Sequence, residues 1–211
     1  MPGPELTGNA PDPLRPGYRL LEVDRGRFAS LPEERVAPLG LVVGAEIAEP
    51  IFAQLTQLAD AESAYRAALR LETLRPHARL DLVRRLRQRQ HPPTAIESAL
   101  DRLQAEGALD DRRFAEHYAA TRAARGRGPA RLIRDLQQQG IERPLAEATV
   151  RRVLAEEGID PTEHVRRLAE RRAAHFAELP TSVRRRRLLA YLQRRGYEGG
   201  DIRKVVEEVC Q

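Results

Sequence analysis

The chain has 211 residues, of which 41% are hydrophobic and 32% charged, so it is polar but can still bury a core. Only 4% are aromatic and tryptophan is absent, which argues against base-stacking platforms or aromatic cages. A single cysteine, Cys210, excludes an internal disulfide and a cysteine-based zinc site. The net charge of +5 is uneven, because residues 1–60 hold five arginines and nine acids, whereas residues 61–211 hold 31 basic and 22 acidic residues.

The basic second part predicts a partner that is nucleic acid or an acidic protein surface. The N-terminus lacks the basic and apolar regions of a leader. No 18-residue apolar run is present, so no membrane span is expected. These features predict a soluble, cytoplasmic protein.

The N-terminal region divides into two segments. Residues 1–17 contain five prolines and are expected to form a flexible tail. Residues 18–58 are expected to form a small β-containing extension, because YRLLEVDRGRFASL indicates two short strands around a turn at residues 24–26 and LGLVVGAEI adds a β-branched stretch. Such a hairpin is too small to be stable alone, so it is expected to pack on the next helix.

From about residue 50 the chain has helical periodicity and repeats itself. The stretches LVRRL (82–86), LIRDL (132–136) and LLAYL (188–192) each place apolar residues on one helix stripe. Apolar residues then follow Leu86, Leu136 and Leu192 at the same three offsets in each copy, which predicts a second helix with one buried face. These following residues are Ile96, Leu100 and Leu103, then Ala146, Val150 and Val153, and finally Ile202, Val206 and Val209. The interval from Leu136 to Leu192 is longer than that from Leu86 to Leu136, so the third copy carries a short insertion.

Helix boundaries repeat as well. Asp60, Asp110 and Asp160 are equally spaced along the chain, each just before a helical pattern, and Gly140 and Gly196 suit left-handed positions at helix ends. The middle copy is expected to have helices at 111–124, 129–139 and 144–156. The predicted fold is mainly α: three tandem three-helix repeats (59–108, 109–158 and 159–211) in an elongated curved stack.

The acidic pair in GALDDRRFAEHY (107–118) is interpreted as a helix start. Asp110 is placed to cap the helix, and Asp111 complements the helix dipole. Leu109 and Phe114 occupy the two positions of a hydrophobic staple. A metal site is not expected, because no histidine or third acid stands close enough in the sequence.

No catalytic or cofactor motif is found. The five histidines show neither HExxH nor triad-like spacing, and GRGPAR (126–131) lacks the P-loop pattern. Gly128 and Pro129 are instead expected to start a helix, and Cys210 is expected to be a bystander thiol. The sequence therefore predicts no catalytic residue, no metal and no cofactor.

Arginines are the candidate binding residues. Seven arginines and one acid lie between residues 112 and 134, and similar arginine stripes are expected on the middle helices of repeats two and three. The alternative is a solvated face with no partner. The candidates for binding are Arg122, Arg125, Arg127, Arg131, Arg134, Arg184, Arg187, Tyr191 and Arg194.

Residues 60–211 resemble the RecX family of bacterial recombination regulators. The resemblance rests on HARLDLVRRLRQR, on the block from Ile96 to Ile141 with its glycines at the family's spacing, and on LLAYLQRRGY. Two departures stand out: Ala78-x-x-Asp81 replaces a common Ser-x-x-Glu cap, and Arg127 stands where an aromatic residue is common.

The resemblance implies a non-enzymatic regulator that binds RecA and RecA–DNA filaments. It implies inhibition of recombinase, ATPase and co-protease activity, and so modulation of DNA repair and the SOS response. The partners expected are RecA and single- and double-stranded DNA, held mainly by charge, with the chain a monomer.

Two other functions are considered. Three-helix modules are similar to helix-turn-helix units, so a DNA-binding protein of transcription-regulator type is the alternative. Such a protein needs a recognition helix with side chains that read bases. The third helix of the middle repeat, PLAEATVRRVLAEEG (144–158), is mixed in charge and does not resemble one. No motif in the sequence supports an enzymatic function. If the arginine face binds the filament, Arg127→Glu with Arg131→Glu should weaken filament binding and leave helicity intact.

Overall fold

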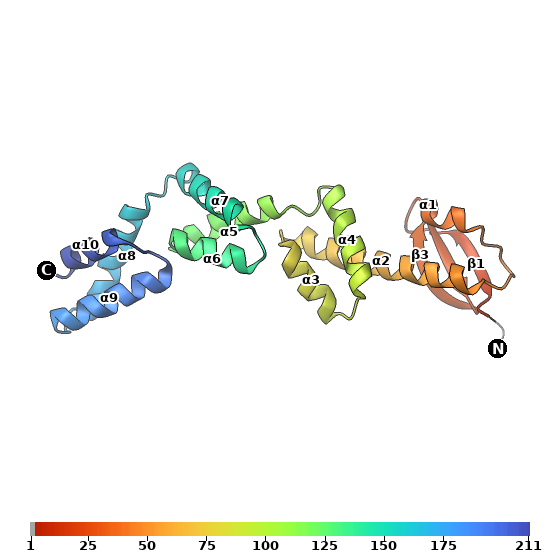
Figure 1. Ribbon diagram of the computed structural model, residues 1–211, viewed down its shortest axis with the longest axis horizontal. Coiled ribbons are helices and arrows are strands. Elements are labelled where there is room, and N and C mark those ends of the chain that lie inside the picture. Colours follow the sequence, from red (N-terminus) through yellow and green to blue (C-terminus); the bar gives the residue numbers. More distant parts are fainter. Residues whose placement is uncertain (1–2) are drawn as a thin grey trace. The chain divides into compact units, whose positions relative to one another are not determined.

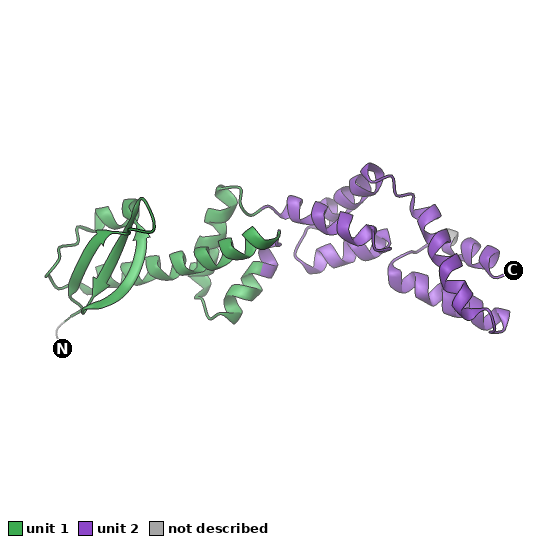
Figure 2. Ribbon diagram, turned by 180° about the vertical axis from the view of Figure 1, so that it is seen from behind, with its two compact units in different colours: residues 1–75, 82–109 green, residues 76–81, 110–211 purple. Residues whose placement is uncertain are grey.

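The computed structural model describes residues 3–211 and divides into two compact units (Figure 2). Residues 1–75 and 82–109 form the first unit, and residues 76–81 and 110–211 form the second. The first unit carries a three-stranded sheet and helices, and the second is entirely helical (Figure 1). None of the helices in the described part is long and apolar enough to cross a membrane.

The elements of the first unit begin with an antiparallel sheet in the order β1-β2-β3. In chain order they are β1 (Leu6–Pro11), β2 (Tyr18–Val23), β3 (Gly26–Pro32), α1 (Glu33–Val36), η1 (Ala37–Leu39), α2 (Glu49–Leu74), α3 (Arg79–Gln88) and α4 (Pro93–Ala105). The first three residues of α3 belong to the second unit. The predicted turn joins β2 to β3, with positive φ at Asp24 and Arg25, as a two-residue hairpin turn with the right twist requires.

The prediction of a flexible tail over residues 1–17 is wrong for β1. Leu6 of this strand is fully buried, and its amide donates to the carbonyl of Ala45 at 3.0 Å. The prolines misled the sequence interpretation because an edge strand tolerates proline at its end, as at Pro11. Residues 1–2 of the predicted tail lie outside the described residues.

The sheet packs on α2, as its small size predicted. Leu21, Leu31 and Leu55 are fully buried in one cluster. Helix α2 runs across the predicted boundary at residue 58, so Asp60 lies inside a helix and the expectation that it precedes one is wrong. Farther along α2, Ala64 packs with Ala95 and Ala99 of α4, and these small side chains let the two helices approach closely.

The second unit contains the second and third repeats. Its helices are α5 (Asp111–Ala123), α6 (Pro129–Gln138), α7 (Arg143–Glu156), α8 (Pro161–Ala173), α9 (Thr181–Arg195) and α10 (Gly200–Val209), with the short η2 (Ala174–Phe176) after α8. The helices predicted for the middle repeat agree with α5, α6 and α7 to within one residue. The insertion in the third repeat corresponds to η2 and to a longer middle helix.

The predicted buried stripe is confirmed. Leu86, Leu136 and Leu192 have no exposed surface. The residues predicted to follow them on a second buried face are buried or packed against the core: Ile96, Leu100, Leu103, Ala146, Val150, Val153, Ile202, Val206 and Val209. The mainly helical fold with a small N-terminal sheet is thus as the apolar periodicity indicated.

The acidic pair lies at a helix start, as predicted. The Asp110 carboxylate accepts from the amides of Arg112 and Arg113 at 2.8 and 3.2 Å. Asp160 caps α8 by accepting from the amide of Thr162 at 2.8 Å. The predicted staple is not found, because Leu109 is buried in the α2–α4 core whereas Phe114 is buried in the α5–α7 core.

Candidate nucleic-acid and protein interface

Arginine side chains of the second unit line two grooves, both with walls from α9. The α6–α9 groove has a volume of about 740 Å³ and is lined by Arg127, Arg131, Arg134, Ala190, Gln193, Arg194 and Arg195. The α8–α9 groove has a volume of about 370 Å³ and is lined by Ala124, Arg125, Gly126, His164, Leu168, Arg171, Arg172, His175, Tyr191 and Arg195. Of the stripe predicted on α9, Arg194 alone lies in the same groove as the arginines of the other predicted stripe, Arg127, Arg131 and Arg134.

Two glycines bring these helices together. The amide of Gly128, the residue just before α6, donates to the carbonyl of Arg195 at 2.7 Å. A Cβ atom on Gly128 would lie 2.5 Å from the carbonyl oxygen of Gly196, and one on Gly196 would lie 2.2 Å from the Cβ of Arg131. Gly196 also has the left-handed φ of 88° predicted for it. Gly128 was predicted only as a helix start. Because it has no side chain, the end of α9 can pack directly against its backbone.

The arginines of the α6–α9 groove are largely paired with acids. Asp135, which is buried, forms an ion pair with Arg127 and a second one with Arg131 at 2.8 Å. Arg134 pairs with Glu198 at 3.0 Å. The sequence interpretation missed Asp135 because an acid near the glycine-bounded end of a helix has no distinguishing local pattern.

Asp135 also accepts a hydrogen bond from the phenol of Tyr118 at 3.1 Å. Burial and the Asp135 charge raise the pKa of Tyr118. This cluster holds Arg127 and Arg131 against the protein, so only part of their charge is available to a partner. The face of α6 is therefore less cationic than its arginine spacing predicted.

The remaining predicted residues are distributed around α5 and α9. Arg122 lies 5.4 Å from the ring centre of Tyr118. Arg184 donates to the carbonyl of Cys210 at 2.9 Å, and Arg187 is exposed on α9.

Arg194 lines the α6–α9 groove, whereas Arg125 and Tyr191 line the α8–α9 groove. The structure thus divides the predicted set among both grooves and two helix faces.

The α8–α9 groove contains residues that the sequence interpretation did not select. Arg171, Arg172, Arg195, His164 and His175 join the predicted Arg125 and Tyr191 there. The guanidinium carbons of Arg172 and Arg195 lie 5.2 and 5.3 Å from the ring centre of Tyr191, a distance at which a cation is attracted by an aromatic ring. The cluster RRLAERR in α8 was the available signal.

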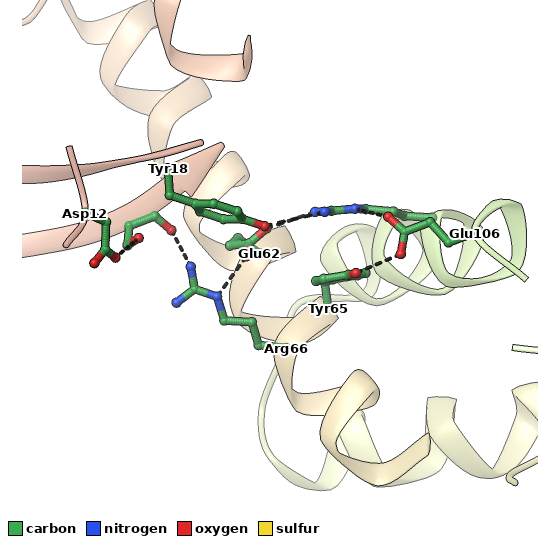
Figure 3. Close-up of polar contacts among 8 residues, drawn as sticks. Asp12, Tyr18, Glu62, Tyr65, Arg66 and Glu106 are labelled. Carbon is green, nitrogen blue, oxygen red and sulfur yellow. Dashed lines mark hydrogen bonds and ion pairs between the residues drawn. The ribbon is translucent and has the colours of Figure 1, made fainter. Parts of the chain in front are cut away.

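A second polar cluster lies in the first unit (Figure 3). The buried carboxylate of Glu62 is held by Arg66 at 2.8 Å and by Arg102 at 3.0 Å. Arg66 also donates a hydrogen bond to the carbonyl of Ser30 in β3 at 2.6 Å, and Arg102 donates one to the carboxylate of Glu106 at 2.9 Å. Because these groups bond to one another, the cluster is structural and ties the sheet to α2 and α4.

The charges on α7 do not favour a base-reading helix. Arg143 pairs with Glu147 at 2.7 Å, and Arg152 pairs with Glu116 at 2.5 Å. A recognition helix needs free polar side chains that reach base edges. No group of three or more potential metal ligands is found among the side chains that the structure describes.

Comparison with known proteins gives consistent matches. Residues 110–150 match the second three-helix domain of RecX, and residues 159–206 match the third. A regulatory protein RecX of Pseudomonas syringae pv. tomato is 42% identical over 133 residues, which cover 63% of this chain and 82% of that protein. The RecX of Halorhodospira halophila is 36% identical over 146 residues, covering 69% and 87%.

Solved structures share the fold. A crystal structure of a regulatory protein RecX aligns with a TM-score of 0.73 at 20% identity, covering 98% of each chain. The RecX structure from Lactobacillus salivarius aligns with a TM-score of 0.59 at 21% identity, covering 71% of this chain and 96% of that one.

Proposed function

Because the chain belongs to the RecX family of regulatory proteins, we propose that it regulates RecA by binding RecA and RecA–DNA filaments. In this proposal it inhibits the ATPase, recombinase and co-protease activities of RecA in the cytoplasm, and so modulates DNA repair and the SOS response. It acts as a monomer, without catalysis.

The observation that carries the proposal is the meeting of arginines from two repeats in one unit. Arg131 and Arg134 come from α6, and Arg194 comes from α9, yet all three line the same groove. A filament presents DNA phosphates and protein at regular intervals. Arginines on successive repeats can therefore bind it at several points, and linked contacts raise the overall affinity well beyond that of each contact.

The direct test is the DNA-stimulated ATPase and strand-exchange activity of RecA with added protein. We expect both activities to fall at substoichiometric to equimolar ratios of this protein to RecA. Full RecA activity at an equimolar ratio would contradict the proposal. Sequence-specific DNA binding in the absence of RecA would instead favour the transcription-regulator alternative.

Because Asp135 forms ion pairs with Arg127 and Arg131, variants of these two arginines do not test filament binding separately from folding. Charge reversal at Arg127 and Arg131 would place two further carboxylates beside a buried one, so it would disturb the repeat as well as the surface. Arg187→Glu with Arg194→Glu is better, because both side chains are exposed on α9. We expect weaker filament binding with unchanged helicity. Arg151→Glu on α7, also exposed, is the control and should bind normally.

A further inference from the structure

The two grooves of the second unit differ in how their charge is balanced. In the α6–α9 groove, two acids form ion pairs with three arginines: Asp135 with Arg127 and Arg131, and Glu198 with Arg134. Neither groove has an acid among its lining residues. The four arginines that line the α8–α9 groove, however, form no ion pair with the described side chains, and two histidines lie beside them. The positive charge of this groove is therefore the less compensated of the two, although the sequence singles out only Arg125 and Tyr191 there.

The arginines of the α8–α9 groove are positioned by backbone and rings. Arg195 donates to the carbonyl of Arg125 at 3.0 Å, and Arg171 donates to the carbonyl of Arg167 at 3.3 Å. Arg172 lies 5.0 Å from the ring centre of Phe176, and its buried Nε has no hydrogen-bond acceptor among the side chains and backbone that the structure describes. These contacts fix the guanidinium groups but leave donors for an anion.

His164 lies on the wall of this groove. Cationic or titratable side chains from three other segments line the same groove: Arg125 of the α5–α6 turn, His175 of η2 and Arg195 of α9. On α8 itself, burial and the charges of Arg167 and Arg171 lower the pKa of His164. Toward α10, Arg166 of α8 forms an ion pair with Glu208 at 2.6 Å. An anion in the groove would offset this repulsion and favour the protonated imidazole.

We propose that the α8–α9 groove binds a backbone phosphate of nucleic acid and that His164 takes up a proton when it does so. This inference rests on the proposed function, in which the protein binds DNA within a RecA–DNA filament. It adds to that function a site for one phosphate and a dependence of binding on pH. Guanidinium and imidazolium groups both donate charge-assisted hydrogen bonds to phosphate oxygens.

A phosphate chain fits better than a small anion because the two grooves share one wall residue. Arg195 lines both of them. A polymer with regularly spaced negative charges can place one phosphate in the α8–α9 groove and a neighbour in the α6–α9 groove. The proton on His164 makes the first of these contacts stronger as the pH falls.

The site is tested with the full chain and a fluorescein-labelled oligo-dT strand, followed by anisotropy over a salt series. Arg125→Ala with Arg171→Ala should weaken binding and reduce the slope of log affinity against log salt by about 0.7 for each phosphate that is no longer bound. Arg143→Ala with Arg151→Ala removes the same charge from α7 and should leave the slope nearer to the wild-type value. Equal slopes for the two double variants would overturn the site.

The proton is tested by NMR titration of His164 in the wild-type chain with and without oligo-dT. Its pKa should rise on binding, and a one-unit rise corresponds to about a tenfold gain in affinity on acidification. His164→Gln should remove that gain, whereas His117→Gln, an exposed change on α5, should retain it. An unchanged pKa with bound DNA would overturn the proton uptake.

A competitor separates phosphate from carboxylate ligands. If poly-L-glutamate raised the pKa of His164 as much as oligo-dT does, the groove would be a protein-binding site and the phosphate assignment would be overturned. The RecA ATPase assay is run on the same variants. Oligo-dT binding with the expected pH response, but no effect on RecA, would contradict the proposed function and support this site.

Discussion

The carboxylate of Asp111 accepts a hydrogen bond from the backbone amide of Arg79 at 2.8 Å, across 32 residues of sequence. Arg79 is the first residue of α3, so its amide has no partner within that helix. Ala78, which precedes it, has no side chain that could cap. The paired aspartates therefore serve two helix starts, Asp110 that of α5 and Asp111 that of α3.

Asp111→Ala should reduce the free energy of unfolding by about 0.5–2 kcal/mol, the usual effect of losing a cap. Hydrogen exchange at the amide of Arg79 should become faster, because its acceptor is removed. Asp111→Asn keeps an acceptor oxygen and should show a smaller change in both quantities. Unchanged exchange at Arg79 in the alanine variant would contradict this role.

Gly128→Ala should disrupt the contact between α6 and α9. Its φ of −76° is ordinary, so the effect is steric: the new Cβ would lie 2.5 Å from the carbonyl oxygen of Gly196. We expect a loss of about 1–3 kcal/mol in urea unfolding, with NMR shifts at Arg131 and Gly196. Gly26→Ala, whose Cβ would meet its nearest neighbour at 3.5 Å, is the control and should change stability by less than about 0.5 kcal/mol.

Asp135→Asn should lower stability and raise DNA affinity together. The change removes the charge that holds Arg127 and Arg131 but keeps the side-chain shape, so the loss should be about 1–3 kcal/mol. The released guanidinium groups should strengthen oligo-dT binding and steepen its salt dependence. Glu147→Gln, which removes an acid from the exposed pair with Arg143, should change neither. Weaker DNA binding by Asp135→Asn would show that the pairing organises the groove.

Glu62→Gln should change the pH dependence of stability. Burial raises the pKa of Glu62 above its ordinary value of 4.5, against the opposing effect of Arg102. A raised pKa means that the folded protein binds this proton more tightly than the unfolded chain, so the contribution is complete below pH 4.5 and is lost as the pH rises through the folded-state pKa. The glutamine variant does not titrate at this position.

The measurement is urea unfolding of both proteins at a series of pH values from 4 to 7. The free energy of unfolding of Glu62→Gln, relative to wild type, should increase with pH across that window and then level off. A relative stability that falls with rising pH would mean that the two arginines lower the pKa of Glu62 below 4.5.

Local sequence determined the helical repeat. The spacing of Leu86, Leu136 and Leu192 and of the apolar residues that follow them fixes which helix faces are buried, because side chains three and four residues apart share one face of a helix. Asp110 and Gly196 were equally readable, since a cap and a left-handed turn depend on the residue and its immediate neighbours. The arginine-rich helices were visible for the same reason.

Tertiary structure decided which of those charges are available. Asp135 forms ion pairs with two arginines of its own repeat. Arg171 and Arg172 line one groove with Arg125 and Arg195 only because α8, α9 and the α5–α6 turn pack together. It also decided that Asp111 caps α3 and that Leu6 belongs to a strand, since both depend on partners that are distant in the sequence. Local patterns specify burial and helix ends, but the pairing of charges depends on distances that only the folded chain sets.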